Sequence, residues 1–190
     1  MTHHSDDNDE SLVRRLKKRD HQAFSILVRR HSDMFYRAAY KVVMNKEDAE
    51  DIVQSAFLKI WDKPSIWKDG KAATFKTWFY KIIMNACIDF KRKRKDITGY
   101  DFSENIAGEY KPADKAMIEV EQQVLIEESM QLLPVKQRAA ITLFYEDGIK
   151  QKEAADILGM SIKAFESLLM RAKKTIKDNI LRHEDIQRRA

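Results

Sequence analysis

The stretch from Ile149 to Lys174 limits the fold of this chain more than any other, because its pattern accommodates two short helices joined by a tight turn. Gly159 stands where a left-handed helix end is expected, and Ser161 is a good N-cap for the next helix. That second helix has one buried stripe of residues three and four apart: Ile162, Phe165, Leu169, Ala172 and Ile176. The layout predicts a helix-turn-helix, whose second helix lies in the DNA major groove. An ordinary helical hairpin is the alternative interpretation.

The whole chain is predicted to be all-α. Only five Gly and three Pro occur in 190 residues, and apolar residues recur at helical spacing over most of the length. No apolar run approaches the roughly 20 residues that span a membrane, and the acidic start is unlike a signal peptide. The single cysteine, Cys87, cannot form an internal disulfide, which suits a reducing compartment. We therefore expect a cytoplasmic protein without membrane insertion.

Charge is distributed unevenly along the chain and indicates two domains. Residues 1–10 carry four acids and no base, residues 11–95 carry 21 bases and nine acids, and residues 96–129 carry nine acids and two bases. Helical periodicity fails over 96–113, where Gly and Pro interrupt the pattern. We predict a disordered acidic tail, a basic helical domain over 11–95, a flexible acidic linker over 96–113 and a second helical domain over 114–190. The two basic domains would face nucleic acid.

One helix of the first domain, capped by Asn45, has an informative outer face. The face opposite its buried stripe carries four residues at helical spacing: Asp51, Gln54, Ser55 and Leu58. A large apolar side chain beside a carboxylate and an amide fits a docking surface for a partner protein. A single exposed leucine is also common on any protein surface. From periodicity alone the two interpretations are equally good.

A second helix of this domain, which begins at Phe75, is basic on its outer face. That face carries Lys76, Tyr80, Lys81 and Asn85, the helix ends in the basic run 91–95, and the preceding loop contains Trp67 and Lys71. Lysines between exposed aromatic rings would bind single-stranded nucleic acid, because lysines attract phosphates and nucleobases stack on rings. Trp78 and Phe79 are assigned to the core. The single-strand interpretation depends on exposure of Trp67 and Tyr80, and core burial is its alternative.

Two conspicuous side chains are interpreted as structural. His31 lies on a buried stripe without a second metal-type residue, so we expect a partly buried histidine and no metal site. Cys87 lies one residue off its stripe and is expected to be a half-buried thiol. No Ser or Tyr nucleophile with a placed base is evident, so no catalytic residue is predicted.

Two sequence blocks resemble the bacterial extracytoplasmic-function (ECF) sigma factors of the sigma-70 family. One block runs from Asp48 to Trp61 and continues from Phe75 to Ile82, and the other runs from Leu132 to Arg138 into the helix-turn-helix. The resemblance extends over residues 11–95 and 114–178. It implies a non-enzymatic factor that binds core RNA polymerase and directs promoter-specific transcription initiation. The first domain would be sigma domain two, and the second would be sigma domain four.

The resemblance also implies roles for individual residues. In the family, sigma domain two docks on the clamp helices of the polymerase β′ subunit, here through Asp48, Asp51, Gln54, Ser55 and Leu58. It melts the −10 promoter element, here with Trp67, Lys71, Lys76, Tyr80, Lys81, Asn85, Arg92 and Arg94. Sigma domain four reads the −35 element as duplex, here with Ser161, Lys163, Ala164, Glu166, Ser167, Met170, Arg171 and Lys174. Many relatives carry basic residues where this chain has Glu166, Leu168 and Met170, so its −35 contacts depart from the common pattern.

Further partners follow from the same resemblance. It implies a second polymerase contact with the β flap, an anti-sigma factor that holds the protein inactive, and a monomeric free state without a cofactor. The acidic linker would thread the polymerase near the path of the nascent RNA. Two other function classes compete: a conventional helix-turn-helix regulator that binds closed duplex, and a nuclease or recombinase with an appended DNA-binding domain. The regulator leaves the basic first domain unexplained, and the enzyme lacks a catalytic constellation.

Overall fold

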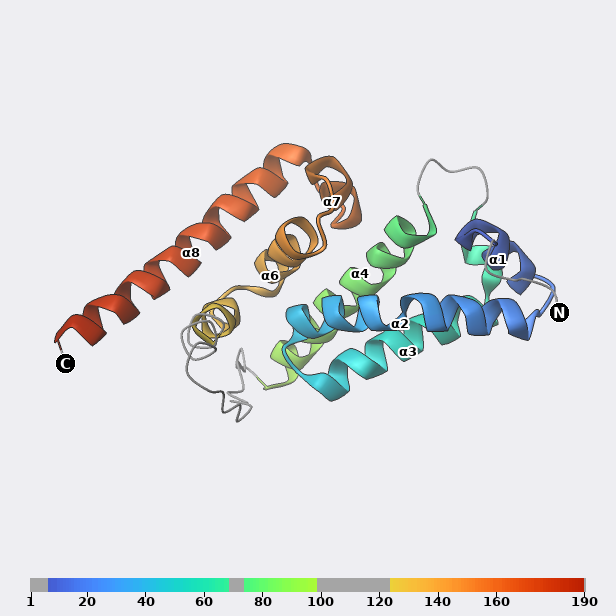
Figure 1. Ribbon diagram of the computed structural model, residues 1–190, viewed down its shortest axis with the longest axis horizontal. Helices are drawn as coiled ribbons and strands as arrows, with labels where there is room; N and C mark the ends of the chain where they lie inside the picture. The colour runs from blue at the N-terminus through green and yellow to red at the C-terminus, as the bar shows by residue number, and fades with distance from the viewer. Residues whose placement is uncertain (1–6, 69–73, 99–123, 190) are drawn as a thin grey trace.

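The computed structural model describes residues 7–68, 74–98 and 124–189, and every regular element in these ranges is a helix (Figure 1). The elements of the first half are α1 (Asp9–Leu16), α2 (His21–Val43), α3 (Lys46–Asp62), the short 3-10 helix η1 (Pro64–Ile66) and α4 (Phe75–Thr98). Those of the second half are a helix over 124–131, α6 (Val135–Ile141), the π-helical turn η2 (Thr142–Glu146), α7 (Gln151–Ile157) and α8 (Ile162–Arg189). The predicted all-helical class is confirmed.

Helix α2 is the centre of the first domain, and α1, α3 and α4 all pack against it. Asp20 caps α2 through the backbone N–H groups of Gln22 and Ala23, and Asn45 caps α3 through the N–H of Asp48. Phe35 of α2 is fully buried and meets the rings of Phe57, Phe79 and Tyr80. Burial of aromatic rings from three helices therefore holds this domain together.

The second domain contains the predicted helix-turn-helix in α7 and α8. Gly159 has a φ of +65°, as expected of a left-handed helix end, and the Ser161 hydroxyl accepts the N–H of Ala164 at 3.2 Å. Phe165 and Ala172 of α8 are fully buried, and Leu169 is nearly so. The motif prediction is therefore confirmed in its turn, its cap and the middle of its stripe. Ile162, which was predicted to be buried, is 43 % exposed because it lies at the first turn of α8, and Ile176 is partly buried.

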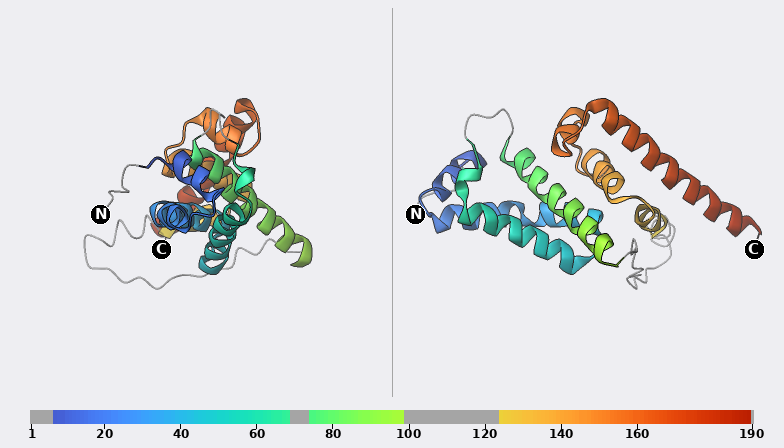
Figure 2. Two further views of the ribbon diagram at one scale, coloured as in Figure 1. Left: turned by 90° about the vertical axis from the view of Figure 1, so that its right-hand side faces the viewer. Right: turned by 180° about the vertical axis from the view of Figure 1, so that it is seen from behind.

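The two domains pack against each other, so that α6 and η2 contact α2 while α6 and α7 contact α4 (Figures 1 and 2). Arg138 of α6 is buried, and its Nε donates to the carbonyl of Val42 at 2.9 Å. Lys41 forms an ion pair with Glu146, and the Thr77 hydroxyl donates to the Glu153 carboxylate. The domain contact therefore joins distant parts of the chain: Arg138 and Val42 are 96 positions apart.

Two predicted boundaries differ from the structure. Asp9 and Glu10 were assigned to the acidic tail, but both lie in α1, where Asp9 pairs with Arg30 and His31. Helix α4 continues to Thr98 and so extends three residues into the predicted linker. The rest of the linker, residues 99–113, and the start of the tail, residues 1–6, lie outside the described residues. In the ranges that are described, no helix is long and apolar enough to cross a membrane.

Candidate functional site

The first candidate surface is the α3 face, which we define as Asp51, Gln54, Ser55 and Leu58. All four side chains are exposed, and Leu58 leaves 49 % of its area open to solvent. Gln54 and Leu58 border a groove of about 640 Å³ between α2 and α3. The floor and walls of this groove are mostly apolar and include Phe24, Val28, Tyr36, Val53 and Phe57. An apolar groove beside a polar rim is the anatomy of a protein-binding surface.

Asp48, which the sequence assigned to the same surface, is placed differently. Its carboxylate lies 3.2 Å from Nη1 of Arg94, a residue that the sequence assigned to −10 DNA. A second groove, of about 550 Å³ between α3 and α4, brings Asp51 and Ser55 next to Asn85. The structure therefore places the predicted docking residues and part of the predicted DNA residues on neighbouring surfaces of one helix pair.

The second candidate surface is the α4 face, which we define as Lys76, Lys81, Asn85 and Arg92. All four are exposed, and Arg92 pairs with Asp89 at 3.1 Å. Lys71, the remaining lysine of the prediction, lies outside the described residues. This basic outer face of α4 agrees with the charge expected of a phosphate-binding surface.

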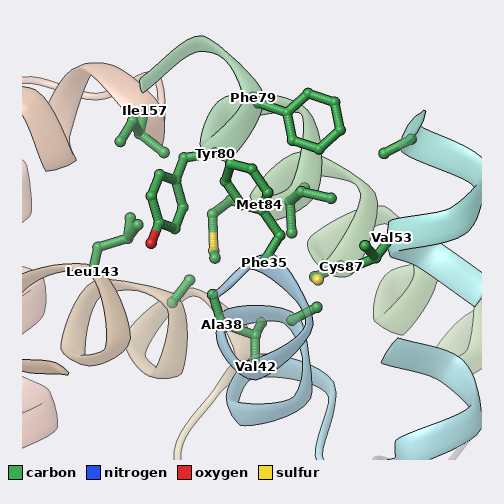
Figure 3. Close-up of a cluster of buried hydrophobic side chains, with 14 of the residues drawn as sticks. Phe35, Ala38, Val42, Val53, Phe79, Tyr80, Met84, Cys87, Leu143 and Ile157 are labelled. Atoms are coloured by element: carbon green, nitrogen blue, oxygen red, sulfur yellow. The ribbon is translucent and has the colours of Figure 1, made fainter. Parts of the chain in front are cut away.

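Of the two alternatives left open for Trp67 and Tyr80, exposure and core burial, the structure shows burial. Trp67 is only 5 % exposed, because its ring packs edge-on against Trp78 with centroids 5.2 Å apart. Tyr80 is only 4 % exposed, and Figure 3 shows it reaching from α4 towards Leu143 and Ile157 of the second domain. Periodicity placed Tyr80 on the outer face of α4, and its ring lies at the edge of the first domain, with its centroid 5.0 Å from that of Phe35. The second domain covers it there.

Tyr80 and Asp147 form the polar centre of this covered region. The Tyr80 hydroxyl lies close to the Asp147 carboxyl group, and burial raises the pKa of Tyr80 above its ordinary value. Burial also raises the pKa of Asp147 to about 6, although the nearby Tyr80 hydroxyl and the cations Lys41 and Arg37 act against the rise. The neighbouring Glu146 adds to it. The domain contact therefore holds a carboxyl group that protonates near neutral pH.

The third candidate surface is the α8 face, formed by the outward residues of the second helix of the motif. Its members are all exposed: Ser161, Lys163, Ala164, Glu166, Ser167, Met170, Arg171 and Lys174. Met170 leaves 67 % of its area open. The Ser167 hydroxyl donates to the Lys163 carbonyl at 2.9 Å, and Arg171 Nε donates to the Ser167 carbonyl at 3.2 Å. These side chains point along their own helix and remain available to a ligand.

The sequence analysis missed the residues that join the domains. Arg138 appeared only at the end of a sequence block, and Glu146, Asp147 and Glu153 were not singled out. Each is polar and lies on a short helix or turn, where periodicity predicts exposure to solvent. The available signal was three acids, Glu146, Asp147 and Glu153, that could pair with the basic first domain.

The structural interpretations of His31 and Cys87 hold, with more burial than expected. His31 is 2 % exposed and its Nε2 lies 2.8 Å from an oxygen of Asp9. Cys87 is fully buried, and burial raises the pKa of its thiol to about 12. Across the ranges that the structure covers, no group of His, Cys, Asp and Glu side chains could hold a metal ion.

Comparison with known proteins places this chain in a family. The family model described as Sigma-70 region 2 matches residues 27–97, and the one described as Sigma-70, region 4 matches residues 123–176. The chain is 30 % identical over 174 residues to the RNA polymerase sigma factor NccH of Alcaligenes xylosoxydans xylosoxydans, which covers 87 % of this chain and 90 % of NccH. The chain belongs to the ECF sigma factors of the sigma-70 family. Sigma factors are initiation factors of transcription and not enzymes.

Two further relatives place this sigma factor within the group. It is 27 % identical over 179 residues to the ECF RNA polymerase sigma factor SigW of Bacillus subtilis, over 88 % of this chain and 94 % of SigW. The solved structure of CnrH in complex with the cytosolic domain of CnrY has the same fold, with a TM-score of 0.64 and 24 % identity over 92 % of this chain and 97 % of that one. The resemblance inferred from the two sequence blocks is thereby confirmed.

Proposed function

We propose that this sigma factor docks on core RNA polymerase through the α3 face, melts the −10 element on the α4 face and reads the −35 element with the α8 face. One observation carries the proposal: the three faces point to solvent from separate helices and consist of residues to which the family resemblance gives these roles. A protein that must hold a polymerase and two promoter elements at once needs three such surfaces.

The α3 face supports docking through its chemistry. Leu58 offers apolar area to a partner, the groove beside it offers aromatic walls, and Asp51 adds an exposed negative charge on the same helix. Interface energy concentrates in such a central apolar contact with polar surroundings. The β′ clamp helices are the proposed partner of this face, and the β flap is the proposed partner of the second domain.

Melting of the −10 element requires the α4 face to reach unpaired bases. Lys76 and Lys81 would bind phosphates, and Asn85 offers an amide to a base edge. Tyr80 can stack on a base only after the second domain has left it, because Asp147, Leu143 and Ile157 now surround it. The proposal therefore includes a separation of the two domains before the promoter opens.

Recognition of the −35 element is assigned to α8. Lys163 and Ser167 lie near the start of the helix, which enters the major groove first, and Arg171 and Lys174 follow where phosphates run. Glu166 can accept a hydrogen bond from a cytosine amino group. In contrast with Tyr80, none of these residues is buried by the first domain.

We further propose an anti-sigma partner for this protein and a cytoplasmic site of action, where polymerase and promoters are found. Support comes from the solved complex of the sigma factor RpoE with the anti-sigma factor NepR from Bartonella quintana, which has the fold of this chain with a TM-score of 0.63 and 24 % identity over 83 % of this chain and 96 % of that one. An exposed apolar groove on a monomer is a surface that an inhibitor could cover as well as the polymerase.

Run-off transcription tests the proposal. Purified protein and core polymerase are incubated with a library of promoter fragments, and transcripts are sequenced at their 5′ ends. We expect starts at a defined distance from a common pair of sequence elements, and none with core polymerase alone. Binding to one duplex site without polymerase, together with no specific transcript, would instead support the regulator hypothesis.

A further inference from the structure

The segment from Asp9 to Arg19 lies outside the residues that the family model matches, yet it contacts both helices that flank the −10 surface. The match begins at residue 27. Leu12, Val13 and Leu16 of α1 are fully buried, so the segment is a fixed part of the domain. Its two ends carry charged side chains that reach across to α3 and α4.

Arg19 binds the end of α3. Its Nη1 donates to the carbonyl of Trp61 at 2.9 Å, its Nη2 lies 3.4 Å from the carbonyl of Asp62, and its guanidinium carbon lies 5.6 Å from the centre of the Trp61 ring. The last carbonyls of a helix lack intrahelical partners and carry partial negative charge, so a cation stabilises them. The Arg19 backbone has a φ of +58°, a conformation that costs energy in a non-glycine residue and aims the side chain at α3.

Glu10 binds the start of α4. Its Oε1 accepts the backbone N–H of Phe75, the first residue of α4, at 3.0 Å. The first N–H groups of a helix lack partners and carry partial positive charge, so a carboxylate stabilises them. The Phe75 ring in turn packs on Trp67, with centroids 6.4 Å apart, and on His31 at 5.5 Å.

Helix α1 is itself anchored to α2 close to Glu10. Asp9 Oδ1 lies 2.7 Å from Nη1 of Arg30, and its Oδ2 lies 2.8 Å from Nε2 of His31. Asp9 therefore binds α2, and the next residue, Glu10, binds α4. These two consecutive residues of α1 connect three helices. The opposite charges of Glu10 and Arg19 match the opposite ends of the two helices that they contact.

We propose that residues 9–19 are a positioning segment that sets the separation between the end of α3 and the start of α4 through Arg19 and Glu10, and so shapes the surface that opens the −10 element. Neither residue needs to touch DNA. The inference rests on the proposed function of the α4 face. It predicts that loss of both bonds impairs promoter opening selectively, while docking through the α3 face and −35 binding through the α8 face are retained.

The test compares holoenzymes that carry Glu10→Ala together with Arg19→Ala, Glu10→Gln alone, or Arg14→Ala. Arg14 is an exposed arginine of α1, so its replacement changes charge without removing a contact to α3 or α4. The promoter is one selected by the wild-type holoenzyme. Opening is followed by 2-aminopurine fluorescence in the −10 element, core affinity by titration, and thermal unfolding by circular dichroism.

We expect the double variant to open the promoter about tenfold more slowly, because the end of α3 and the start of α4 are then no longer held by Arg19 and Glu10, with core affinity within about twofold of wild type. Glu10→Gln retains an acceptor oxygen and should be close to wild type, as should Arg14→Ala. Equal opening rates in the double variant and wild type would overturn the inference, and so would a parallel loss of opening and core affinity. Failure of the wild-type holoenzyme to open any promoter would overturn the proposed function instead.

Discussion

The hydroxyl of Tyr80 in the first domain is buried next to the carboxyl group of Asp147 in the second. The two residues are 67 positions apart in the chain, and their contact covers the one aromatic side chain on the α4 face that the resemblance assigns to DNA. The same carboxyl group titrates near pH 6, because it is buried against Tyr80. Domain closure and protonation of Asp147 are therefore linked.

The first prediction concerns pH. In an open arrangement Asp147 would be solvated with a pKa near 3.8, whereas in the closed arrangement its pKa is about 6, so the closed form binds the proton more tightly. Closure should lose stability as pH rises from 3.8 to about 6 and change little above that, because Asp147 is then ionised in both arrangements. Small-angle scattering should report a smaller radius of gyration at pH 5 than at pH 8.

The groups that face Asp147 limit this effect. Tyr80 approaches from α4, Lys41 and Arg37 approach from α2, and Glu146 precedes Asp147 in the chain. Asp147→Asn removes the titrating group and should make the radius of gyration independent of pH in this range. Asp156→Asn, at an exposed position of α7, is the matched control and should retain the dependence. An unchanged pH response in Asp147→Asn would refute the linkage.

The second prediction concerns domain separation. Thr77 and Glu153 are in direct contact across the domain boundary, so cysteines at both positions can be joined by a short, reducible thiol crosslinker. The crosslinked protein should bind core polymerase through the α3 face yet fail to bind single-stranded −10 DNA, because Tyr80 stays covered. A reductant should restore binding.

Cys87 does not interfere with this experiment, because it is fully buried and its thiol has a pKa of about 12, which keeps it protonated and unreactive. The two single-cysteine variants serve as controls and should bind −10 DNA before and after treatment. Full −10 binding by the crosslinked protein would show that the domains need not separate.

The third prediction concerns docking. Replacement of Asp51 and Leu58 together by Ala should weaken core binding by about 30-fold or more, since one central apolar contact and its charged neighbour are lost. Both side chains are exposed, so the unfolding temperature should change little. Fluorescence titration with core polymerase measures the affinity. Leu132→Ala removes an equally exposed leucine from the second domain and provides the control. Unaltered affinity of the double variant would disprove the docking assignment.

The fourth prediction separates positioning from reading on α8. Arg171→Ala should weaken binding of promoter DNA similarly across −35 sequences and lower the slope of log affinity against log salt by about one. Lys163→Ala, near the start of the helix, should instead change the preferred −35 bases by about 1–3 kcal/mol at one position. Holoenzyme binding to a set of single-base variants at several salt concentrations distinguishes the two. Identical sequence profiles for Lys163→Ala and wild type would exclude Lys163 from base recognition.

The local sequence pattern was sufficient to predict a residue's position wherever that position depends on neighbours in the same helix. The turn at Gly159, the caps at Asp20, Asn45 and Ser161, and the stripe of α8 all follow from backbone hydrogen bonding and a repeat of 3.6 residues. Leu58 was predicted on an outer face and is exposed there. Such features depend on residues only a few positions apart, and these can be read from the sequence.

Contacts between distant segments could not be predicted from helical periodicity. The ring of Trp67 is buried against Trp78 of α4, and Tyr80 is covered by the second domain, so the partners that bury them lie in other elements. Glu10 belonged, by composition, to a polar tail, and only the fold shows it at the start of α4. The Glu10–Phe75 hydrogen bond joins positions 65 residues apart, so neither local sequence predicts it.

The sequence by itself determined the helices, the helix-turn-helix and the family of this protein, because these depend on spacing along one chain segment. Tertiary structure alone decided that α6, η2 and α7 pack on the first domain, that Asp147 is buried against Tyr80, and that Arg19 and Glu10 bridge α3 and α4. The physical reason is that a polar side chain on a helix surface is equally suited to water and to a matching partner. Which of the two it meets is decided when the helices pack.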